Sequence, residues 1–567
     1  RCIPAGTLVH LTRGLVKIED VRDGDEVITS KGTHPVIGLE EQGEQELVTI
    51  HHQLGSTEVS LRHNMKVFKS PTESEFKMAQ DVNPGDRLIF SEHLIKGNET
   101  KLPSWHYEKP PSSTTCKDLV IPELDSDIAW FIGYFHGDGY TYPNFEKNGF
   151  NAYVRFAVLP EETEIIKRCR TQMERFGVNT SIIKASDRDR SIKINAQSKQ
   201  LAWYLSKFKV ANESINIPQE ILTAKPNVRA AYLAGTLDAD GTTKGRPLQA
   251  ISSVYLEFVK QLQALYATLG IATRMKLRRE SVGNWKTLYN LNIVGKLPLK
   301  NFIDRVSEYS VKCQQNPVTN GRPQHDYGFP SQWIQDSDLK YNGKWCKTST
   351  QMTIDKYIEC GGQYDGCMPI EVTSIEFEGK QAETYDLAVK DVHEFIINDG
   401  LYVSNTAEIM FGEHDDKEFL NLKNYEVNPD RMAWGWSSNN SILAELGMDY
   451  TNIAKKIALN GEPGVCYLEN MRNYGRMGDP PDGRDKKVLG GNPCFSIDTM
   501  IMTNEGIRSF KDLVGKQFVA VVDGKEYPST EDGIFKTGDD KQLYKMELAN
   551  GSTIRATENH KFVTPDG

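Results

Sequence analysis

Residues 233–241 read Leu-Ala-Gly-Thr-Leu-Asp-Ala-Asp-Gly, and residues 131–139 read Phe-Ile-Gly-Tyr-Phe-His-Gly-Asp-Gly. Each stretch carries two small residues spaced four apart, which fall on one helical face and allow a second helix backbone to approach closely. The glycine that closes each stretch suits the left-handed backbone position that ends many helices. The sequence therefore predicts two helices that pair along these faces, one ending at Asp138 and the other at Asp240.

The two terminal aspartates are candidate metal ligands. A carboxylate at a helix C-terminus is disfavoured by the helix dipole unless a cation lies beside it. Asp138 and Asp240 together could hold Mg²⁺, which activates water and stabilises the leaving oxygen of a phosphodiester. The alternative is a pair of solvated acids at helix ends. Because the motif occurs as a spaced pair, we favour the catalytic metal site.

The sequence around these stretches repeats between residues 122 and 305. In each half an apolar helix is followed by a polar strand region and by a second helix that closes on Phe-Gly-Val (176–178) or Leu-Gly-Ile (269–271). The paired motifs resemble those of the LAGLIDADG homing endonucleases. This resemblance implies an α/β endonuclease domain that cleaves a double-stranded DNA homing site.

Two departures from the family pattern leave a structurally intact but degenerate endonuclease as an alternative. His136 stands where the family usually has Asp. The Lys that commonly precedes Ile-Pro between the motifs has no counterpart in Ile-Asn-Ile-Pro (215–218).

Basic residues follow each acidic motif at similar positions. They are Lys184, Arg188, Arg190 and Lys193 in the first half, and Arg274, Lys276, Arg278, Arg279 and Lys286 in the second. Runs of charge are more often solvated faces, and Asp187 and Asp189 cancel part of the charge in the first half. The similar placement in both halves favours contacts to DNA phosphates.

The sequence on both sides of this region reads as short strands. Apolar alternation between turn signals runs from residue 2 to about 90 and returns from 369 to 403. Residues 306–368 are irregular and are expected to be a linker or accessory region. An all-β domain is therefore predicted to be interrupted and then resumed, with one part at 2–100 and the other at 369–405.

Chemistry-bearing residues mark both ends of this interrupted domain. They stand in the stretches Cys-Ile-Pro-Ala-Gly-Thr (2–7), Ser-Leu-Arg-His (60–63), Tyr-Asp-Leu (385–387), His-Glu-Phe (393–395) and Val-Ser-Asn-Thr (403–406). This combination resembles the intein family. The resemblance implies the all-β Hint (hedgehog/intein) fold and self-catalysed protein splicing, in which the intein leaves and its flanking exteins are joined.

Cys2 is the candidate nucleophile of the first splicing step. An amide must become a thioester before the chain can be rearranged, and a thiol with an appreciable thiolate fraction is well suited to this at neutral pH. The departing amine must be protonated, which requires a positioned histidine acting as general acid. His63 is the candidate, oriented by Ser60, which stands where the family usually has Thr.

The later steps fall to the C-terminal motifs. The acyl group passes to Thr406, whose hydroxyl needs a nearby base, and Asp386 is the candidate. The side-chain amide of Asn405 then attacks its own carbonyl and releases the intein as a succinimide. Ser404 stands where the family usually has His, so assistance must come from elsewhere, and His393 could supply it. A slow or arrested last step is the alternative.

Two other functions compete with splicing. A Hedgehog-like autoprocessing domain uses a Cys and a His for cleavage but has no terminal Asn and no ligation step, so Asn405 followed by Thr406 argues against it. An ordinary β-rich binding module would not cleave itself.

Residues 406–493 differ in character from the β regions. Amphipathic helical patterns cover 441–446 and 452–459. Joining Arg1 to Thr406 gives a flank that, with Ser-Asn-Asn-Ser, Gly-Glu-Pro-Gly and the Asn-Pro beginning at Asn492, resembles adenosylcobalamin-dependent ribonucleotide reductase. The resemblance implies an α/β host that, when complete, binds adenosylcobalamin and a ribonucleotide. A segment of some other α/β enzyme is the alternative.

A second intein start follows directly. Cys494 opens Cys-Phe-Ser-Ile-Asp-Thr, and Thr-Glu-Asn-His spans Thr557 to His560. Residues 494–567 are therefore expected to be the N-terminal part of a second intein, truncated or split.

Composition limits the remaining possibilities. A length of 567 residues suggests several domains, and a net charge of -10 argues against nonspecific polyanion binding by the whole molecule. No apolar run approaches the ~20 residues of a membrane span. Nine cysteines without a CxxC pair indicate free thiols, so we expect a reducing, cytoplasmic compartment and no membrane partner.

Overall fold

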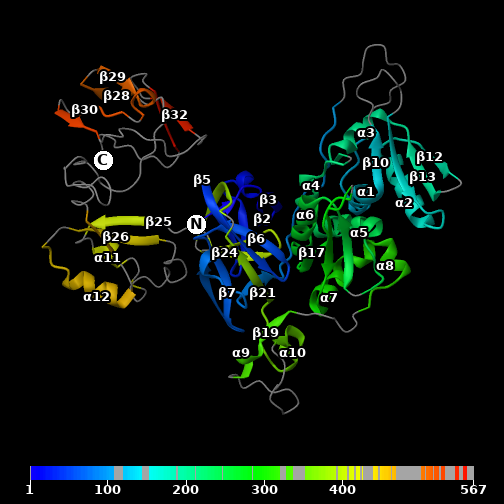
Figure 1. Cartoon of the computed structure of the whole chain (residues 1–567), viewed down its shortest axis with the longest axis horizontal. Coiled ribbons are helices and arrows are strands. Elements are labelled where there is room, and N and C mark those ends of the chain that lie inside the picture. Colours follow the sequence, from blue (N-terminus) through cyan, green and yellow to red (C-terminus); the bar gives the residue numbers. More distant parts are fainter. Residues whose placement is uncertain are drawn as a thin grey trace. The chain divides into compact units, whose positions relative to one another are not determined.

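The protein divides into two compact units, Arg1–Thr406 and Ala407–Gly567. In the first unit the computed structural model describes residues 2–106, 119–142, 152–186, 189–210, 212–245, 247–283, 285–319, 327–335, 351–377, 379–390, 392 and 394–404. In the second it describes residues 408–413, 417–421, 424, 438–444, 447–460, 463–467, 500–504, 506–514, 516–522, 525–529, 543–547 and 553–557. Figure 1 shows the elements of both units.

A large antiparallel sheet forms one part of the first unit. Its strands are β1 (Ile3–Pro4), β2 (Leu8–Leu11), β3 (Gly14–Lys17), β4 (Glu26–Thr29), β5 (Gly32–His52), β6 (Gly55–Ser60), β7 (Asn64–Ser70), β8 (Glu73–Met78), β9 (Arg87–Ser91), β21 (Cys367–Glu376), β22 (Gln381–Val389), β23 (Glu394–Ile397) and β24 (Leu401–Ser404). Early and late strands interleave in the order β1-β22-β5-β21-β9-β7-β24-β23-β2-β3. The predicted return of the strand pattern near residue 369 is confirmed, because β21 to β24 complete a sheet that β1 to β9 begin.

A helical insertion, residues 119–316, separates β9 from β21. Its elements are α1 (Ser126–Asp138), β10 (Gly139–Tyr142), β11 (Tyr153–Val158), α2 (Thr163–Arg175), β12 (Thr180–Ser186), β13 (Asp189–Ala196), α3 (Lys199–Ser206), β14 (Lys209–Val210), β15 (Ser214–Ile215), α4 (Gln219–Leu222), α5 (Pro226–Asp240), β16 (Leu248–Ser253), α6 (Leu256–Ala267), β17 (Thr273–Arg279), β18 (Leu288–Ile293), α7 (Lys296–Arg305) and α8 (Val311–Gln315). Each half places a sheet after its first helix: β10-β11-β13-β12 follows α1, and β16-β18-β17 follows α5. The predicted duplication is therefore present.

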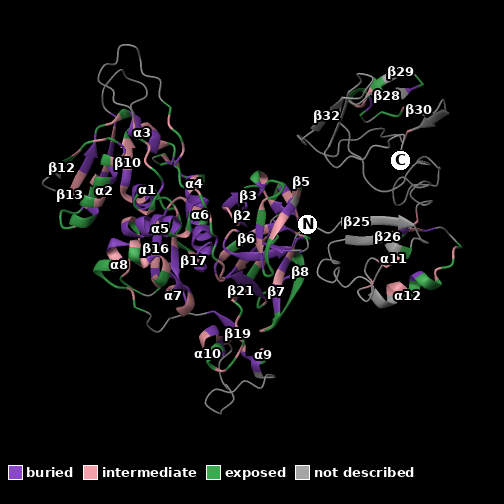
Figure 2. Cartoon of the chain, turned by 180° about the vertical axis from the view of Figure 1, so that it is seen from behind, coloured by how far each residue is buried: buried purple, intermediate pink, exposed green. Residues whose placement is uncertain are grey.

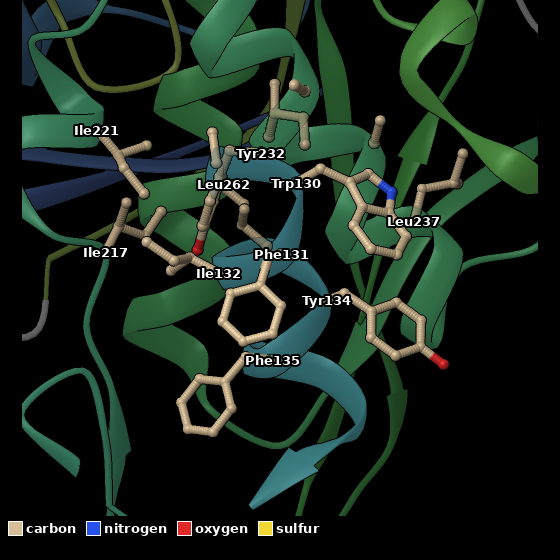
Figure 3. Packing of buried hydrophobic residues seen from close by; sticks show 14 of the residues in the cluster. Trp130, Phe131, Ile132, Tyr134, Phe135, Ile217, Ile221, Tyr232, Leu237 and Leu262 are labelled. Carbon is tan, nitrogen blue, oxygen red and sulfur yellow. The ribbon is translucent and has the colours of Figure 1, made fainter. Parts of the chain in front are cut away.

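The two motif helices, α1 and α5, form where the sequence predicts them. Asp125 caps α1 by accepting a hydrogen bond from the Ile128 amide, and Pro226 opens α5 at a position where a missing N–H costs nothing. Both helices are buried along most of their length (Figure 2), so their amphipathic signal is weak. Figure 3 shows Phe131 and Tyr134 of α1 within this core.

Backbone contact between α1 and α5 depends on two glycines. A Cβ added to Gly133 would lie 2.1 Å from the carbonyl oxygen of Tyr232, and one added to Gly235 would lie 2.1 Å from the carbonyl oxygen of Trp130. No side chain fits between atoms at these distances. The prediction that small residues pair the helices is confirmed.

Replacing Gly235 with alanine should lower the free energy of unfolding by about 3 kcal/mol, because the obstructing atoms belong to a packed backbone. Gly38→Ala in β5 is the matched control, since its Cβ would make an ordinary contact 3.7 Å from the Ala388 Cβ. Chemical denaturation of the two variants measures the difference. Equal stability of both variants would contradict backbone contact between the helices.

The glycines that end the two motifs do not adopt the predicted left-handed conformation. Gly139 has φ -83° and Gly241 has φ -95°, so both are extended. Close approach explains them instead: an added Cβ at Gly139 would lie 2.7 Å from the Phe135 carbonyl oxygen, and one at Gly241 would lie 2.5 Å from the Ala250 carbonyl oxygen. The residue type was predicted for the wrong physical reason.

The rest of the first unit is a small accessory region between α8 and β21. It contains β19 (Gly328–Pro330), α9 (Ser331–Gln335), β20 (Gln351–Thr353) and α10 (Ile354–Glu359). Phe329 packs against Phe68 of β7 with ring centroids 5.1 Å apart. This contact joins the described part of the region to the large sheet, and that part contains helices and strands that the irregular sequence did not predict.

The second unit contains a parallel sheet of β25 (Glu408–Glu413), β26 (Ser438–Ala444) and β27 (Gly464–Tyr467). The predicted helix at 441–446 is wrong, because β26 pairs with strands on both sides and buries Ile442 and Ala444. The predicted helix at 452–459 is confirmed as α12 (Thr451–Asn460). The other elements are α11 (Lys417–Leu420), β28 (Met500–Thr503), β29 (Gly506–Ser509), α14 (Phe510–Leu513), β30 (Val519–Val522), β31 (Lys525–Pro528), β32 (Leu543–Glu547) and β33 (Thr553–Thr557).

Among the described residues of either unit, no helix is long and apolar enough to span a membrane.

Candidate active sites

Cys2 is held against the turn that follows β6. Its backbone N–H donates to Ser60 Oγ over 2.8 Å, and the Ser60 N–H donates to the Cys2 carbonyl oxygen over 3.0 Å. Both residues are buried, with 2% and 3% of their surfaces exposed. Two hydrogen bonds therefore hold the backbone of Cys2, and the peptide bond that precedes this residue is the one predicted to be cleaved.

His63 belongs to the same turn. Its backbone N–H donates to the Ser60 carbonyl oxygen over 2.9 Å, and its own carbonyl oxygen accepts from the Ala79 N–H over 2.7 Å. The side chain is buried, with 1% of the residue exposed. The structure therefore places the predicted general acid in the turn that binds Cys2.

The thiol of Cys2 is more protonated than predicted. Burial raises its pKa above the usual value, and the nearby Asp386 carboxylate adds to the rise. Gln45 Nε2 donates to the sulfur over 3.4 Å. The expected thiolate fraction is therefore small at neutral pH, and the proton must leave as the sulfur attacks.

Asp386 reaches this site from the other end of the sequence. It lies on β22, directly after Tyr385, which pairs with Ile3 of β1. Asp386 is 7% exposed. The pairing of β1 with β22 therefore brings Asp386, the predicted base of a late step, next to Cys2, the predicted nucleophile of the first step.

The described strands also bring the C-terminal segment to this region. Ser404 ends β24 opposite Glu394 of β23, and Val403 pairs with Met65 of β7, two residues after His63. The other predicted residues of this junction, His393, Asn405 and Thr406, lie outside the described residues.

Asp138 and Asp240 end α1 and α5 at a point where the helices touch. A Cβ added to Gly137 would lie 2.2 Å from the Ala239 Cβ and 3.1 Å from Asp240 Oδ2. Burial and the Asp240 charge raise the pKa of Asp138 to about 6, and burial raises the pKa of Asp240. The two carboxylates therefore repel each other, and a cation between them would relieve this repulsion.

Two lysines missed by the sequence analysis hold the ends of the motif helices. Lys209 Nζ donates to the carbonyl oxygens of His136 and Gly137, at 2.7 Å each. Lys312 Nζ donates to those of Ala239 and Gly241, at 3.0 Å each. Each cation satisfies carbonyl groups that a helix C-terminus leaves free and opposes the helix dipole.

Lys209 also supplies a charge beside the two carboxylates. Burial lowers its pKa to about 8, while Asp240 and Asp138 act in the opposite direction. Lys209 lies in β14, and so not directly before the Ile-Pro (217–218) where the LAGLIDADG pattern commonly has a lysine. The site therefore contains a lysine, although none precedes Ile-Pro (217–218) directly.

His136, which stands where the LAGLIDADG family usually has Asp, occupies a buried packing position. Its counterpart Asp238 is buried and accepts hydrogen bonds from Trp130 Nε1 at 2.7 Å, Ser310 Oγ at 2.6 Å and the Val311 N–H at 2.8 Å. His136 is also buried, and its Nδ1 lies 2.6 Å from the Tyr232 hydroxyl. Neither residue is the aspartate that ends its helix, so this change leaves the candidate metal ligands intact.

The donor set at the helix ends suits a hard divalent cation. Carboxylate oxygens are the protein ligands that Mg²⁺ prefers, and Mg²⁺ commonly uses only one or two of them because it keeps several waters. Among the described residues there is no group of three or more His, Cys, Asp or Glu that could hold a metal. Asp138 and Asp240 therefore supply the one or two carboxylates that Mg²⁺ commonly takes from a protein.

The first-half basic residues do not share one face. Lys193 pairs with Ala157 of β11, on the sheet face that also carries Arg155. Lys184 pairs with Ile192, which places Lys184 on the opposite face from Lys193. The strand register shifts between Lys184 and Ser186, beside Arg190. Arg188 lies outside the described residues. Of this predicted group, Lys193 alone is shown to share the face of Arg155, which the sequence analysis missed.

The outer face of the second sheet is polar. Gln249, Asn290 and Lys276 lie on it, and Asn290 Nδ2 donates to Gln249 Oε1 over 3.0 Å. Arg278 Nη1 reaches the same Gln249 oxygen at 3.5 Å. Arg274 differs from the expectation, because its Nε donates over 2.7 Å to the carbonyl oxygen of Gln53, in the turn between β5 and β6.

The tip of the second half carries the remaining basic residues. The Arg279 guanidinium lies 4.9 Å from the ring centroid of Trp285, which is 67% exposed. Lys286 Nζ donates to the Asn212 carbonyl oxygen over 2.7 Å. Arg279 therefore lies beside an exposed aromatic ring, whereas Lys286 bonds to a backbone carbonyl.

A family model described as a LAGLIDADG-like domain matches residues 227–307. This chain contains a LAGLIDADG-like domain. The match begins in α5 and covers the second half of the helical insertion, including Asp240, β17 and α7. Lys312 lies just beyond the matched part of the LAGLIDADG-like domain.

Two of the curated relatives are adenosylcobalamin-dependent ribonucleoside-triphosphate reductases. The chain is 53% identical over 100 residues to an adenosylcobalamin-dependent ribonucleoside-triphosphate reductase of Euglena gracilis, which covers 17% of this chain and 14% of the relative. It is 50% identical over 94 residues to a probable enzyme of the same name from Dictyostelium discoideum, covering 16% and 12%. The chain thus spans about one seventh or less of these relatives.

The solved structures to which this chain is similar include homing endonucleases and an intein. Mesophilic variants of the homing endonuclease I-DmoI align with 17% identity over 32% of this chain and 88% of that chain, with a TM-score of 0.27. The gp41-1 intein aligns with 18% identity over 16% of this chain and 68% of that chain, with a TM-score of 0.14.

Most of the predicted site residues in the second unit lie outside the described residues. These are Asn492, Cys494 and His560. Thr557 ends β33 and pairs with Leu543 of β32.

Proposed function

We propose that residues 2–405 are an intein that excises itself and joins its flanks. The observation that carries this proposal is the attachment of Cys2: its N–H donates to Ser60 Oγ over 2.8 Å in the turn that contains His63. This hydrogen bond holds the N–H of the peptide that must break, and a histidine in the same turn can protonate the departing amine.

The first two steps move the acyl group from nitrogen to sulfur and then to oxygen. The Cys2 sulfur attacks the Arg1 carbonyl carbon and the bond to the Cys2 nitrogen breaks. The nitrogen takes a proton from His63, and the thiol proton passes to the imidazole in its place. The Thr406 hydroxyl then attacks the thioester, gives its proton to Asp386 and displaces the Cys2 thiolate. The buried Asp386 is suited to this role because little water competes for its oxygens.

The last steps release the intein and repair the host chain. The Asn405 side-chain nitrogen attacks the Asn405 backbone carbonyl, so the bond to the Thr406 nitrogen breaks and a succinimide forms. The freed Thr406 amine then displaces its own ester oxygen, which leaves an ordinary amide between Arg1 and Thr406. We propose that His393 assists the cyclisation, since Ser404 has no titratable group.

A small thiol tests the first step directly. The Asn405→Ala chain, with a peptide tag before Arg1, should release that tag on incubation with a thiol, because the thiol intercepts the Cys2 thioester. Cys2→Ala in the same background should release none. Equal tag release with and without Cys2 would exclude the proposed thioester.

We propose that the helical insertion is a DNA endonuclease acting on a double-stranded homing site. Asp138 and Asp240 would hold Mg²⁺, which when bound activates water and stabilises a leaving oxygen of the phosphodiester. Arg155, Lys193 and Lys276, together with the amides of the polar sheet faces, would contact the duplex. The raised pKa of Asp138 supports this assignment, because mutual repulsion favours a bound cation.

Lys209→Met should slow DNA cleavage by about 10²-fold, because it removes a buried positive charge next to both aspartates and frees three carbonyls at the end of α1. The neighbouring Lys207→Met is the control, since Lys207 is exposed and contacts the ring of Trp105 at 4.7 Å. The substrate is a duplex in which the codons for Arg1 and Thr406 are adjacent, and a Cys2→Ala background keeps the chain whole. Equal cleavage rates in both variants would remove Lys209 from the site.

We propose the following division of the chain: a Hint splicing domain at 2–100 and 369–405, an endonuclease at 122–305, an accessory region at 306–368, a reductase extein at 406–493 and part of a second intein at 494–567. The identities of 53% and 50% to adenosylcobalamin-dependent reductases support the extein assignment. The complete host would bind adenosylcobalamin and a ribonucleotide, with Asn492 beginning its substrate loop. Cys494, Thr557 and His560 would act in the second intein.

A further inference from the structure

A buried ion pair lies at the C-terminal end of the large sheet. Lys66 of β7 contacts Glu394 of β23, and their side chains are 13% and 7% exposed. The Ser30 N–H donates to Glu394 Oε1 over 2.6 Å, and Lys66 Nζ donates to Ser30 Oγ over 3.1 Å. Lys66 Nζ also lies 5.0 Å from the centroid of the Tyr402 ring. The pair is therefore enclosed by three separate parts of the sheet.

The ion pair spans the strands that lead to the C-terminal junction. Glu394 pairs with Ser404, the last residue of β24, and Val403 pairs with Met65, the neighbour of Lys66. In the sequence, Glu394 directly follows His393 and Ser404 directly precedes Asn405. Any shift of β23 against β24 would therefore move the two proposed reacting segments relative to each other.

Stability alone is a poor reason for such a pair. Taking two charges out of water costs several kcal/mol per ion, and a well-packed apolar pair is often as stable. What a hydrogen-bonded ion pair supplies is a fixed register, because only one alignment of β7 and β23 brings its charges together.

Ser404 provides the second observation. Its hydroxyl is buried and has no hydrogen-bond partner among the described residues, and the residue is 3% exposed. The side chain that precedes the cleaved bond therefore does not anchor the strand end. Its cross-strand neighbour Glu394 is anchored instead, by the ion pair with Lys66.

We propose that Lys66 and Glu394 are positioning residues for cleavage at the C-terminal junction, holding β23 and β24 in the register that brings Asn405 to its reactive geometry. The inference rests on the proposed splicing function. It assigns no proton transfer to either residue: the pair acts through the strands, and the chemistry stays with Asn405 and His393.

Glu394→Gln tests the pair with little change in shape. The glutamine keeps the volume and an oxygen for the Ser30 N–H but loses the charge that Lys66 needs. We expect C-terminal cleavage to slow by at least about tenfold, because small displacements of reacting groups are costly, with thiol-induced N-terminal cleavage unchanged. Mass spectrometry resolves the two products in one time course.

Two lysine variants separate charge from packing. Lys66→Met should reproduce the loss, whereas Lys66→Arg should retain most C-terminal cleavage because it keeps the cation. Lys380→Met is the matched control: Lys380 contacts Glu58 at 2.6 Å, but its side chain is 48% exposed. This surface pair should matter little to either cleavage.

Each other outcome contradicts the inference. Equal slowing of both cleavages by Glu394→Gln would show that the pair supports the whole fold, and no slowing would show that the strands hold register without it. Failure of the unsubstituted chain to cleave at either junction would instead overturn the proposed splicing function, and the inference with it.

Discussion

Replacing His63 with alanine should lower the rate of thiol-induced N-terminal cleavage by about 10²- to 10⁴-fold, the usual contribution of a positioned general acid. The Cys2 nitrogen is a poor leaving group unless it is protonated, and the turn that binds the Cys2 backbone also contains His63, the proposed acid. The measurement is the first-order rate of tag release from the Asn405→Ala chain in excess thiol.

Two controls separate catalysis from folding in that experiment. Arg62→Ala changes an exposed residue of the same turn and should leave the rate unchanged. Ser60→Thr keeps the hydroxyl that accepts from the Cys2 N–H and should retain most activity. A His63→Ala chain that releases the tag as fast as Arg62→Ala would remove His63 from the mechanism.

Asp138→Asn should abolish DNA cleavage, with a loss of at least about 10²-fold, while making the metal-free protein more stable at neutral pH. The carboxamide cannot balance the charge of a divalent cation, so activity falls. It also removes a charge that Asp240 repels and burial disfavours, so the free energy of unfolding rises. Loss of activity with a gain of stability is not expected of a residue that merely holds the fold.

The contribution of Asp138 to the free energy of unfolding should change with pH in one direction. The folded-state pKa of Asp138 is about 6, above the ordinary value for an unfolded aspartate. The folded state therefore binds this proton more readily, and the contribution of Asp138 to stability rises as pH falls through about 6 and is lost above it. Thermal unfolding of the Cys2→Ala chain without metal, compared with the same chain carrying Asp138→Asn, isolates that contribution. Identical profiles would contradict the raised pKa.

Local motifs predicted the parts of the sites that depend on neighbours in sequence. Gly133 and Gly137 fall on one face of α1, and Gly235 and Ala239 on one face of α5, by spacing alone, so the pairing of the two helices followed from the sequence. Gly139 and Gly241 were recognised as necessary glycines, but the reason is contact with Phe135 and Ala250 and not a left-handed turn. Spacing specifies a residue's face, whereas close approach depends on the packed neighbours.

Long-range partners could not be predicted in the same way. Lys209 and Lys312 bond to backbone carbonyls some 70 positions earlier in the chain, and carbonyls carry no sequence signal. The separation of Lys184 from Lys193 depends on strand register, which a one-residue shift reverses. The helix predicted at 441–446 failed because pairing of β26 on both sides outweighs a short local pattern.

The most direct test of the central claim is the intact mass of the full chain, carrying a tag before Arg1, beside its Asn405→Ala variant. Splicing predicts a ligated product that lacks the mass of residues 2–405, together with the free intein, from the unsubstituted chain alone. A product of full, unprocessed mass from both proteins would contradict self-excision.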